Sequence, residues 1–188
     1  TRSRLLGKEE EAIATFKKIL EQDDTNDVVY FELAKIYLST NAPNDALGAI
    51  KKAVALQPKN IWYQEELAAA YAANDDFVAA GEVYKQLVAQ RPGEQKFYYD
   101  LAFHYVKNND IKDAIQVFDQ HEKRFGVSEE VIGRKFNLYK TLNNSSKAEG
   151  ELAKLVKAFP NDSAFAIGLA KFYEDINNVN KAKSTYQK

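Results

Sequence analysis

One register recurs every 34 residues along this chain, and no insertion or deletion interrupts it between residues 7 and 188. An alanine and a tyrosine mark it most clearly, at Ala12, Ala46, Ala80, Ala114, Ala148 and Ala182, and at Tyr37, Tyr71, Tyr105, Tyr139 and Tyr173. Sequence periods of about 20 to 50 residues are typical of repeat proteins, in which each unit packs only against its neighbours. We therefore predict that one structural unit builds the whole chain.

Two turn registers divide each unit. Residue types that tolerate a left-handed backbone recur in the first register, at Gly7, Asn41, Asp75, Asn109, Asn143 and Asn177. The second register holds Pro58, Pro92 and Pro160, with Asp24 and Gly126 in two other units, and proline cannot continue a helix. Good N-cap types follow two residues later, at Asn26, Asn60, Ser128 and Asp162, whereas Glu94 departs from this pattern. Apolar residues between the turns have helical spacing, so each unit is predicted to contain two helices of about 12–15 residues.

The order of these residues resembles the tetratricopeptide repeat (TPR) family, whose unit carries a Leu-Ala pair, a tyrosine, an alanine, a large apolar residue and a proline. The pair stands here at Leu33-Ala34, Leu67-Ala68, Leu101-Ala102 and Leu169-Ala170. The resemblance covers the chain and implies an all-α, right-handed superhelical solenoid of antiparallel helix pairs, a single array of about five and a half repeats. These repeats are expected at 1–26 (partial), 27–60, 61–94, 95–128, 129–162 and 163–188 (truncated).

The repeat expected at 129–162 departs most from the pattern. Lys135 and Phe136 stand where leucine and alanine are expected, and His121 and Gly126 break the pattern just before it. We therefore expect the packing of this repeat against the preceding one to be the weakest in the array.

Charge and composition argue against several classes of function. The 26 basic and 27 acidic side chains are well mixed and give a net charge of −1, so nothing favours nucleic-acid binding. No apolar run is long enough to span a bilayer, so we expect no direct membrane insertion. The chain has no cysteine, which excludes disulfides and thiolate chemistry. A soluble protein of this kind suits both cytoplasm and periplasm, so the localisation stays open.

No motif for catalysis, metal binding or cofactor binding is present. The only histidines, His104 and His121, are separated and lie in otherwise apolar registers, where we expect packed core side chains rather than metal ligands. The sequence therefore predicts no enzyme activity, no metal and no cofactor.

The TPR resemblance also implies that the first helices of successive repeats line a concave groove, which binds an extended or helical peptide. Registers that face away from the second helix give the candidate groove residues: Phe31, Glu32, Lys35, Trp62, Glu66, Ala69, Ala72, Ala73, Tyr99, Asp100, Phe103, Arg134 and Asn137. We therefore expect a protein–protein interaction scaffold that binds a peptide or partner helix in this groove, without catalysis.

Three features of these candidates bear on binding, and the first two each have two interpretations. The aromatic residues, at Phe31, Trp62, Tyr99 and Phe103, either anchor a ligand or pack against the neighbouring first helix. The acidic row of Glu32, Glu66 and Asp100, followed by Arg134, either binds a ligand with basic and acidic stretches or is paired locally. The alanines Ala69, Ala72 and Ala73 leave the floor of the groove low.

Two alternative functions remain from the sequence. The chain lacks any methionine and is expected to be a fragment, which allows it to be the regulatory arm of a larger enzyme. Its last helices lack a polar cap, so it is also a candidate structural spacer or homo-oligomerisation module, which could form a homodimer through its uncapped C-terminal end. Leu169, Phe172, Val179 and Tyr186 are the expected exposed apolar residues at that end.

Overall fold

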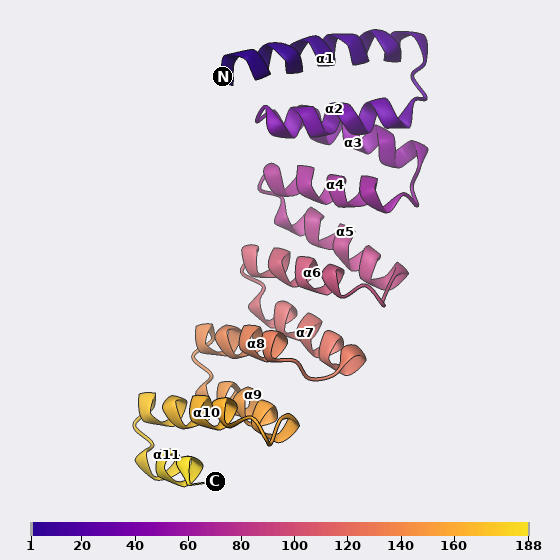
Figure 1. Ribbon diagram of the computed structural model, residues 1–188. Coiled ribbons are helices and arrows are strands. Elements are labelled where there is room, and N and C mark those ends of the chain that lie inside the picture. The colour runs from indigo at the N-terminus through magenta and orange to yellow at the C-terminus, as the bar shows by residue number, and fades with distance from the viewer. Residues whose placement is uncertain (1, 188) are drawn as a thin grey trace. The chain divides into compact units, whose positions relative to one another are not determined.

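The computed structural model describes residues 2–187, with side chains from residue 7 onward. This part of the chain is helical and contains no strand (Figure 1), which confirms the all-α prediction. The helices are α1 (Arg2–Gln22), α2 (Asp27–Ser39), α3 (Pro43–Leu56), α4 (Ile61–Ala73), α5 (Phe77–Gln90), α6 (Gln95–Lys107), α7 (Ile111–Phe125), α8 (Glu129–Thr141), α9 (Ser145–Ala158), α10 (Ser163–Asp175) and α11 (Val179–Tyr186).

The helices fall into two compact units. The first unit ends at Asn109 and contains α1–α6, and the second begins at Asp110 and contains α7–α11. In the first unit each helix from α2 to α5 packs against the next one along the chain, and α2 also contacts α4. In the second unit the same holds from α7 to α10. Paired helices such as α2 and α3 run in opposite directions (Figure 1), as the repeat pattern predicted.

The first turn register has the predicted left-handed backbone in five of its six positions. Asn41, Asp75, Asn109, Asn143 and Asn177 have φ values between 53° and 64°. The prediction of a turn at Gly7 was wrong, because Gly7 lies inside α1. A glycine inside a helix costs only about 1 kcal/mol relative to alanine, and the helix continues through it.

The predicted N-caps hold the starts of four first helices. Their side-chain oxygens accept hydrogen bonds from the backbone N–H groups of Val29 (Asn26, 3.1 Å), Trp62 (Asn60, 3.1 Å), Val131 (Ser128, 3.4 Å) and Ala164 (Asp162, 3.0 Å). Glu94, which departs from the N-cap pattern, makes no such bond before α6. The cap register therefore fixes where most first helices begin.

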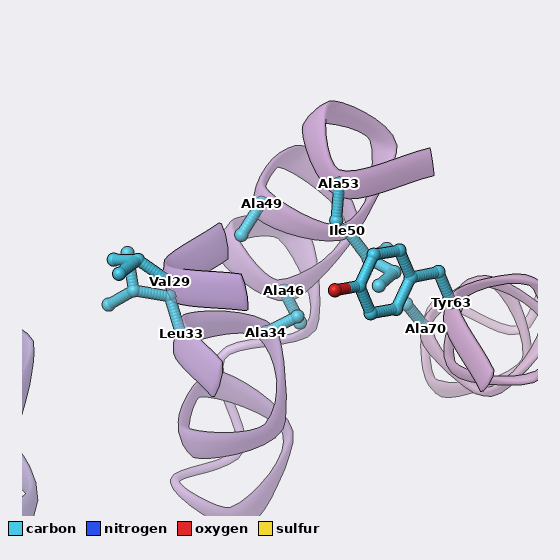
Figure 2. Close-up of a cluster of buried hydrophobic side chains, with 9 residues drawn as sticks. All are labelled: Val29, Leu33, Ala34, Ala46, Ala49, Ile50, Ala53, Tyr63 and Ala70. Atoms are coloured by element: carbon cyan, nitrogen blue, oxygen red, sulfur yellow. The ribbon is translucent and has the colours of Figure 1, made fainter. Parts of the chain in front are cut away.

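Small residues set the distance between paired helices. In the cluster shown in Figure 2, Ala34 of α2 and Ala46 and Ala53 of α3 are completely buried beside Ile50 and Tyr63. The repeated alanine is also completely buried in three other second helices, at Ala80, Ala114 and Ala148. A methyl group at this register lets two helix backbones approach closely while larger side chains fill the space around it. The 34-residue alanine register is thus a packing requirement.

The last two helices are less exposed than the sequence suggested. Leu169 and Phe172 are buried, so the prediction that they form exposed apolar surface was wrong. Phe172 packs edge-to-face against Phe136, with ring centroids 5.6 Å apart, so an aromatic side chain from α8 covers it. Val179 and Tyr186 are exposed, as predicted.

Candidate functional site

The first unit presents most of the predicted groove residues on α2, α4 and α6. Trp62 and Phe103 are 73% and 52% exposed. Ala69 and Ala73 are also exposed, and Ala72 is half-buried. Trp62 lies two helical turns before Ala69 on α4, and Phe103 occupies on α6 the register that Ala69 occupies on α4. Trp62 and Phe103 are therefore exposed aromatic candidates, and Ala69 and Ala73 add exposed methyl groups on α4.

The other two aromatic candidates contribute less free surface. Phe31 is half-buried, and its ring lies 4.9 Å from the ring of Tyr63 on α4. The ammonium of Lys35, on the same helix, lies 5.3 Å from the centroid of the Phe31 ring. Tyr99 is also half-buried. For Phe31 the structure supports packing against the neighbouring first helix, whereas Trp62 and Phe103 remain open to a partner.

Tyr63 also fixes α4 against α2. Its hydroxyl donates a hydrogen bond to Asp27 Oδ2 at 2.8 Å. Burial, together with this bond, raises the pKa of Tyr63 to about 12, so the hydroxyl keeps its proton and its donor role throughout the physiological range. The positions of Phe31 and Trp62 on adjacent helices are therefore set by a buried contact beneath the face.

Most of the charged candidates form ion pairs with nearby side chains. Lys35 lies 3.2 Å from Glu32, and Lys96 lies 3.4 Å from Asp100 and also pairs with Glu65 of α4. In the second unit, Arg134 and Asn137 are exposed on α8, and Arg134 lies 2.8 Å from Glu130. Local pairing, one of the two interpretations offered by the sequence, therefore describes Glu32, Asp100 and Arg134.

Glu66 differs from the other members of the acidic row. It is half-buried, and no ammonium or guanidinium lies within 4.0 Å of it among the residues described. Burial raises the pKa of Glu66 above its ordinary value, and Glu32 adds to this effect while Lys35 opposes it. This carboxylate is thus the least compensated charge on the predicted face.

A pocket of about 560 Å³ opens at the edge of this face, where the segments before α4 and α6 meet the first turns of these helices. Its lining includes Lys59, Ile61, Trp62, Glu65, Arg91, Glu94, Lys96 and Phe97. Sequence reasoning missed it because Lys59 and Arg91 belong to the second turn register rather than to a first helix. Their signal was present in the sequence, since Lys59 follows Pro58 and Arg91 precedes Pro92.

The histidines are packed, as predicted. His104 is buried and stacks on Tyr84, with ring centroids 5.3 Å apart and planes 19° from parallel. His121 is buried beside Phe125 at 4.7 Å. Burial lowers the pKa of both imidazoles below the ordinary value, so both favour the neutral form.

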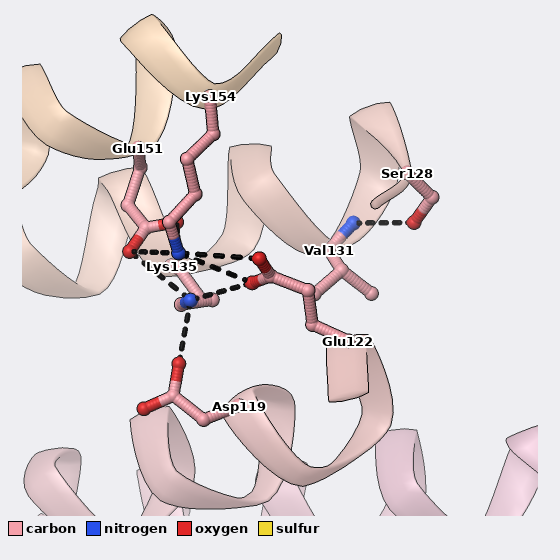
Figure 3. A network of polar contacts seen from close by, with 7 residues as sticks. All are labelled: Asp119, Glu122, Ser128, Val131, Lys135, Glu151 and Lys154. Carbon is pink, nitrogen blue, oxygen red and sulfur yellow. Dashed lines mark hydrogen bonds and ion pairs between the residues drawn. The ribbon is translucent and has the colours of Figure 1, made fainter. Parts of the chain in front are cut away.

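The second unit contains a buried ionic network that the sequence did not predict (Figure 3). Lys135 is 0% exposed, and its Nζ atom lies 2.6 Å from Asp119, 2.8 Å from Glu122 and 3.0 Å from Glu151. Lys154 lies 3.2 Å from Glu122 and 3.1 Å from Glu151. The network joins α7, α8 and α9 at the place where sequence reasoning expected loose packing.

Hydrogen bonds favour the charged forms of Lys135 and Glu122. Burial alone would lower the pKa of Lys135, but hydrogen bonds to the carboxylates of Asp119, Glu122 and Glu151 outweigh it and raise that pKa. Burial would raise the pKa of Glu122, but hydrogen bonds from Lys135 and Lys154 lower it instead. A lysine in place of the usual leucine is therefore accommodated by charge pairing rather than by apolar contact.

Helices long and apolar enough for a membrane span do not occur in the region from residue 2 to residue 187.

Several solved structures share the fold. The structure of Naa15/Naa10 bound to HypK-THB superposes with a TM-score of 0.73 at 19% identity, over 98% of this chain and 29% of that chain. A tetratricopeptide repeat protein from Parabacteroides merdae ATCC 43184 gives 0.64 at 21% identity, over 96% and 72%. MamA gives 0.64 at 22% identity, over 83% and 91%. The chain thus spans less than a third of the Naa15/Naa10 chain that it matches.

A family model matches more than half of the sequence. The model describes the TPR domain of cytochrome c-type biogenesis protein H, and it matches residues 7–130. No curated protein matches the chain. The helix pairs, the left-handed Asn and Asp turns and the buried alanine register are the features that the TPR resemblance implied. The chain belongs to the family of cytochrome c-type biogenesis protein H TPR domains.

Proposed function

We propose that this chain is a protein–protein interaction scaffold, and that the face formed by α2, α4 and α6 binds a peptide segment or helix of a partner protein. The observation that carries the proposal is the exposure of Trp62 and Phe103, 73% and 52%, together with the exposed small side chains of Ala69 and Ala73 on α4. The TPR fold, which contains no recognised catalytic motif here, supports a binding role rather than a catalytic one.

The physical basis is the surface that a partner would bury. An apolar surface gains about 25 cal/mol for each Å² removed from water, and exposed aromatic side chains are frequent anchors in interfaces. The alanines of α4 provide depth, because a partner side chain can approach the helix backbone there. The Lys107 ammonium lies 5.5 Å from the Phe103 ring and leaves the ring more than half exposed.

The test begins with peptides selected from a random library on the intact chain, and their affinities are then measured for two variants. Ala69→Arg fills the floor and Phe103→Glu removes the aromatic surface, and we expect each to weaken binding about 30-fold, as for a loss of about 2 kcal/mol. Because Trp62 is the only tryptophan, its fluorescence reports binding directly.

Matched control variants lie on the second helix α5. Ala89→Arg and Val78→Glu introduce the same two side chains at an exposed alanine and at a valine that is about as exposed as Phe103. We expect them to leave affinity unchanged. Selected peptides that bind both sets of variants equally well would refute the assignment of the face.

The family description directs the choice of defined probes. It names cytochrome c-type biogenesis, so we propose that peptides from proteins of that process are tested first after the random library. Binding that is lost in Ala69→Arg and kept in Ala89→Arg supports this partner class, and binding that is unaffected by both argues against it.

We also propose a second function, self-association through the last helices. Ile176, Val179 and Tyr186 are exposed on or beside α11. Light scattering over a concentration series tests this, with Val179→Glu as the variant expected to abolish a dimer. A chain that stays monomeric at the highest concentration contradicts the proposal.

A further inference from the structure

The pocket at the start of α4 and α6 has the size of a ligand site. Its volume of about 560 Å³ lies inside the range of about 300–1,000 Å³ that is usual for such sites. The backbone around it is well fixed, because Asn60 caps α4 at the N–H of Trp62 and Lys96 of α6 pairs with Glu65 of α4. The pocket is therefore held open by ordered contacts on both sides.

One part of the lining is apolar. Trp62 is 73% exposed at this position, and Ile61 and the buried Phe97 lie beside it. A wide indole surface that the protein leaves open can stack on an aromatic or large aliphatic group. The pocket thus offers one apolar contact surface.

The charges of the lining are unequal. Lys96 and Glu65 neutralise one another. Lys59 and Arg91 line the same pocket, and among the side chains described, from residue 7 to residue 187, no carboxylate lies within 4.0 Å of either one. Glu94 is the remaining acidic residue of the lining. Two cations and one anion are therefore left over, and the pocket favours a negatively charged group.

We propose that this pocket binds a carboxylate that stands next to an apolar side chain in a partner peptide. The apolar side chain stacks on Trp62, and the carboxylate is held by Arg91 and Lys59. Guanidinium groups match the geometry of a carboxylate and can donate two parallel hydrogen bonds to it. This site goes beyond the proposed function, because it uses neither Phe103 nor the alanines of α4.

The experiment follows the single Trp62 indole signal by NMR and by fluorescence during titration with small probes. N-acetylphenylalanine carries an α-carboxylate, and N-acetylaspartyl-phenylalaninamide carries a side-chain carboxylate. N-acetylphenylalaninamide is neutral, and phenylalaninamide is cationic. We expect at least one acid to bind saturably and about tenfold more tightly than the neutral amide, and the tighter acid identifies the source of the carboxylate. Equal affinity for acid and amide, tightest binding of the cationic probe, or no saturable shift would overturn the proposal.

Variants separate this site from the peptide-binding face. Arg91→Gln and Lys59→Gln should each weaken binding of the acid about fivefold or more, while Glu94→Gln should strengthen it by removing repulsion. Lys52→Gln, at an exposed lysine of α3, is the matched control and should change nothing. Ala69→Arg should leave binding of the acid intact even where it abolishes binding of library peptides. An effect of Lys52→Gln as large as that of Lys59→Gln would also overturn the proposal.

Discussion

Replacing Lys135 with methionine should destabilise the second unit by about 3 kcal/mol. Methionine has a similar length and helix propensity, so the change removes the ammonium and little else. Three carboxylates lie within 3.0 Å of that ammonium. Removing one partner of a buried ion pair costs about 3–5 kcal/mol, because the remaining charge is left unpaired in a poorly solvated place.

The structure places the expected loss at the low end of this range. The Glu151 side chain is only 6% exposed and cannot recover its hydration. Lys154 still lies 3.1–3.2 Å from Glu151 and Glu122, so neither carboxylate loses its last partner. Asp119 is more than half exposed and returns to water at little cost. Lys154→Met should cost only about 1 kcal/mol or less, because that ammonium is 41% exposed and Lys135 remains.

The assay is urea unfolding followed by far-ultraviolet circular dichroism, with Lys171→Met on an exposed position of α10 as the control. Adding Glu151→Gln to Lys135→Met should restore part of the loss, since it removes a buried carboxylate that Lys154 alone compensates only in part, and the two changes should be coupled by about 1 kcal/mol or more. A Lys135→Met variant no less stable than Lys154→Met would refute the reasoning. So would a double variant whose loss is the sum of the two single losses.

Three further predictions follow from local contacts. Hydrogen bonds from Lys135 and Lys154 outweigh burial and hold the pKa of Glu122 below its ordinary value of 4.5. The stability that the ionised Glu122 contributes is therefore present above pH 4.5 and is lost as the pH falls through the lower pKa of the folded state. Melting temperatures of wild type and Glu122→Gln, measured from neutral to acid pH, will show this loss. Asn60→Ala removes a cap bond and should cost about 1 kcal/mol in urea unfolding, whereas Glu94→Ala, at a position with no cap bond, should cost nothing. Ala46→Leu places a larger side chain in a completely buried register and should cost about 1–3 kcal/mol, while Ala89→Leu at an exposed position should be neutral in the same assay.

The helices and their turns could be predicted from the sequence because they depend on residue types with local effects. An asparagine at position 41 tolerates a left-handed backbone whatever surrounds it, and an alanine at position 46 is small in any environment. Gly7 shows the limit of this reasoning. A glycine permits a turn but does not require one, and the turns elsewhere form because a second packed helix follows or precedes them.

The Lys135 network could not be predicted, because its partners are defined by distance rather than by register. Lys135 alone breaks the leucine register, and the sequence therefore marked it as a packing defect. Its compensation comes from Asp119 and Glu122 on α7 and Glu151 on α9, whose contacts with α8 are known only once the helices are placed. A buried lysine is stable when several carboxylates surround it, and this depends on the tertiary structure.

On the candidate face, too, the repeat determines the position of a side chain but not the charged residues around it. Glu32, Glu66 and Asp100 share one register on α2, α4 and α6, yet Lys35 and Lys96 compensate the first and the last while Glu66 is left half-buried without such a partner among the described residues. The register sets where each carboxylate stands, and the neighbours that differ between repeats set its charge balance. A partner that binds the first unit therefore cannot be distinguished by the repeated Leu, Ala and Tyr residues, which recur at the same register in α2, α4 and α6 and are buried or half-buried there. We expect specificity to come from residues that occur once in the array, such as Trp62 and Arg91, and the matched variants on α5 and α3 are chosen to test that distinction.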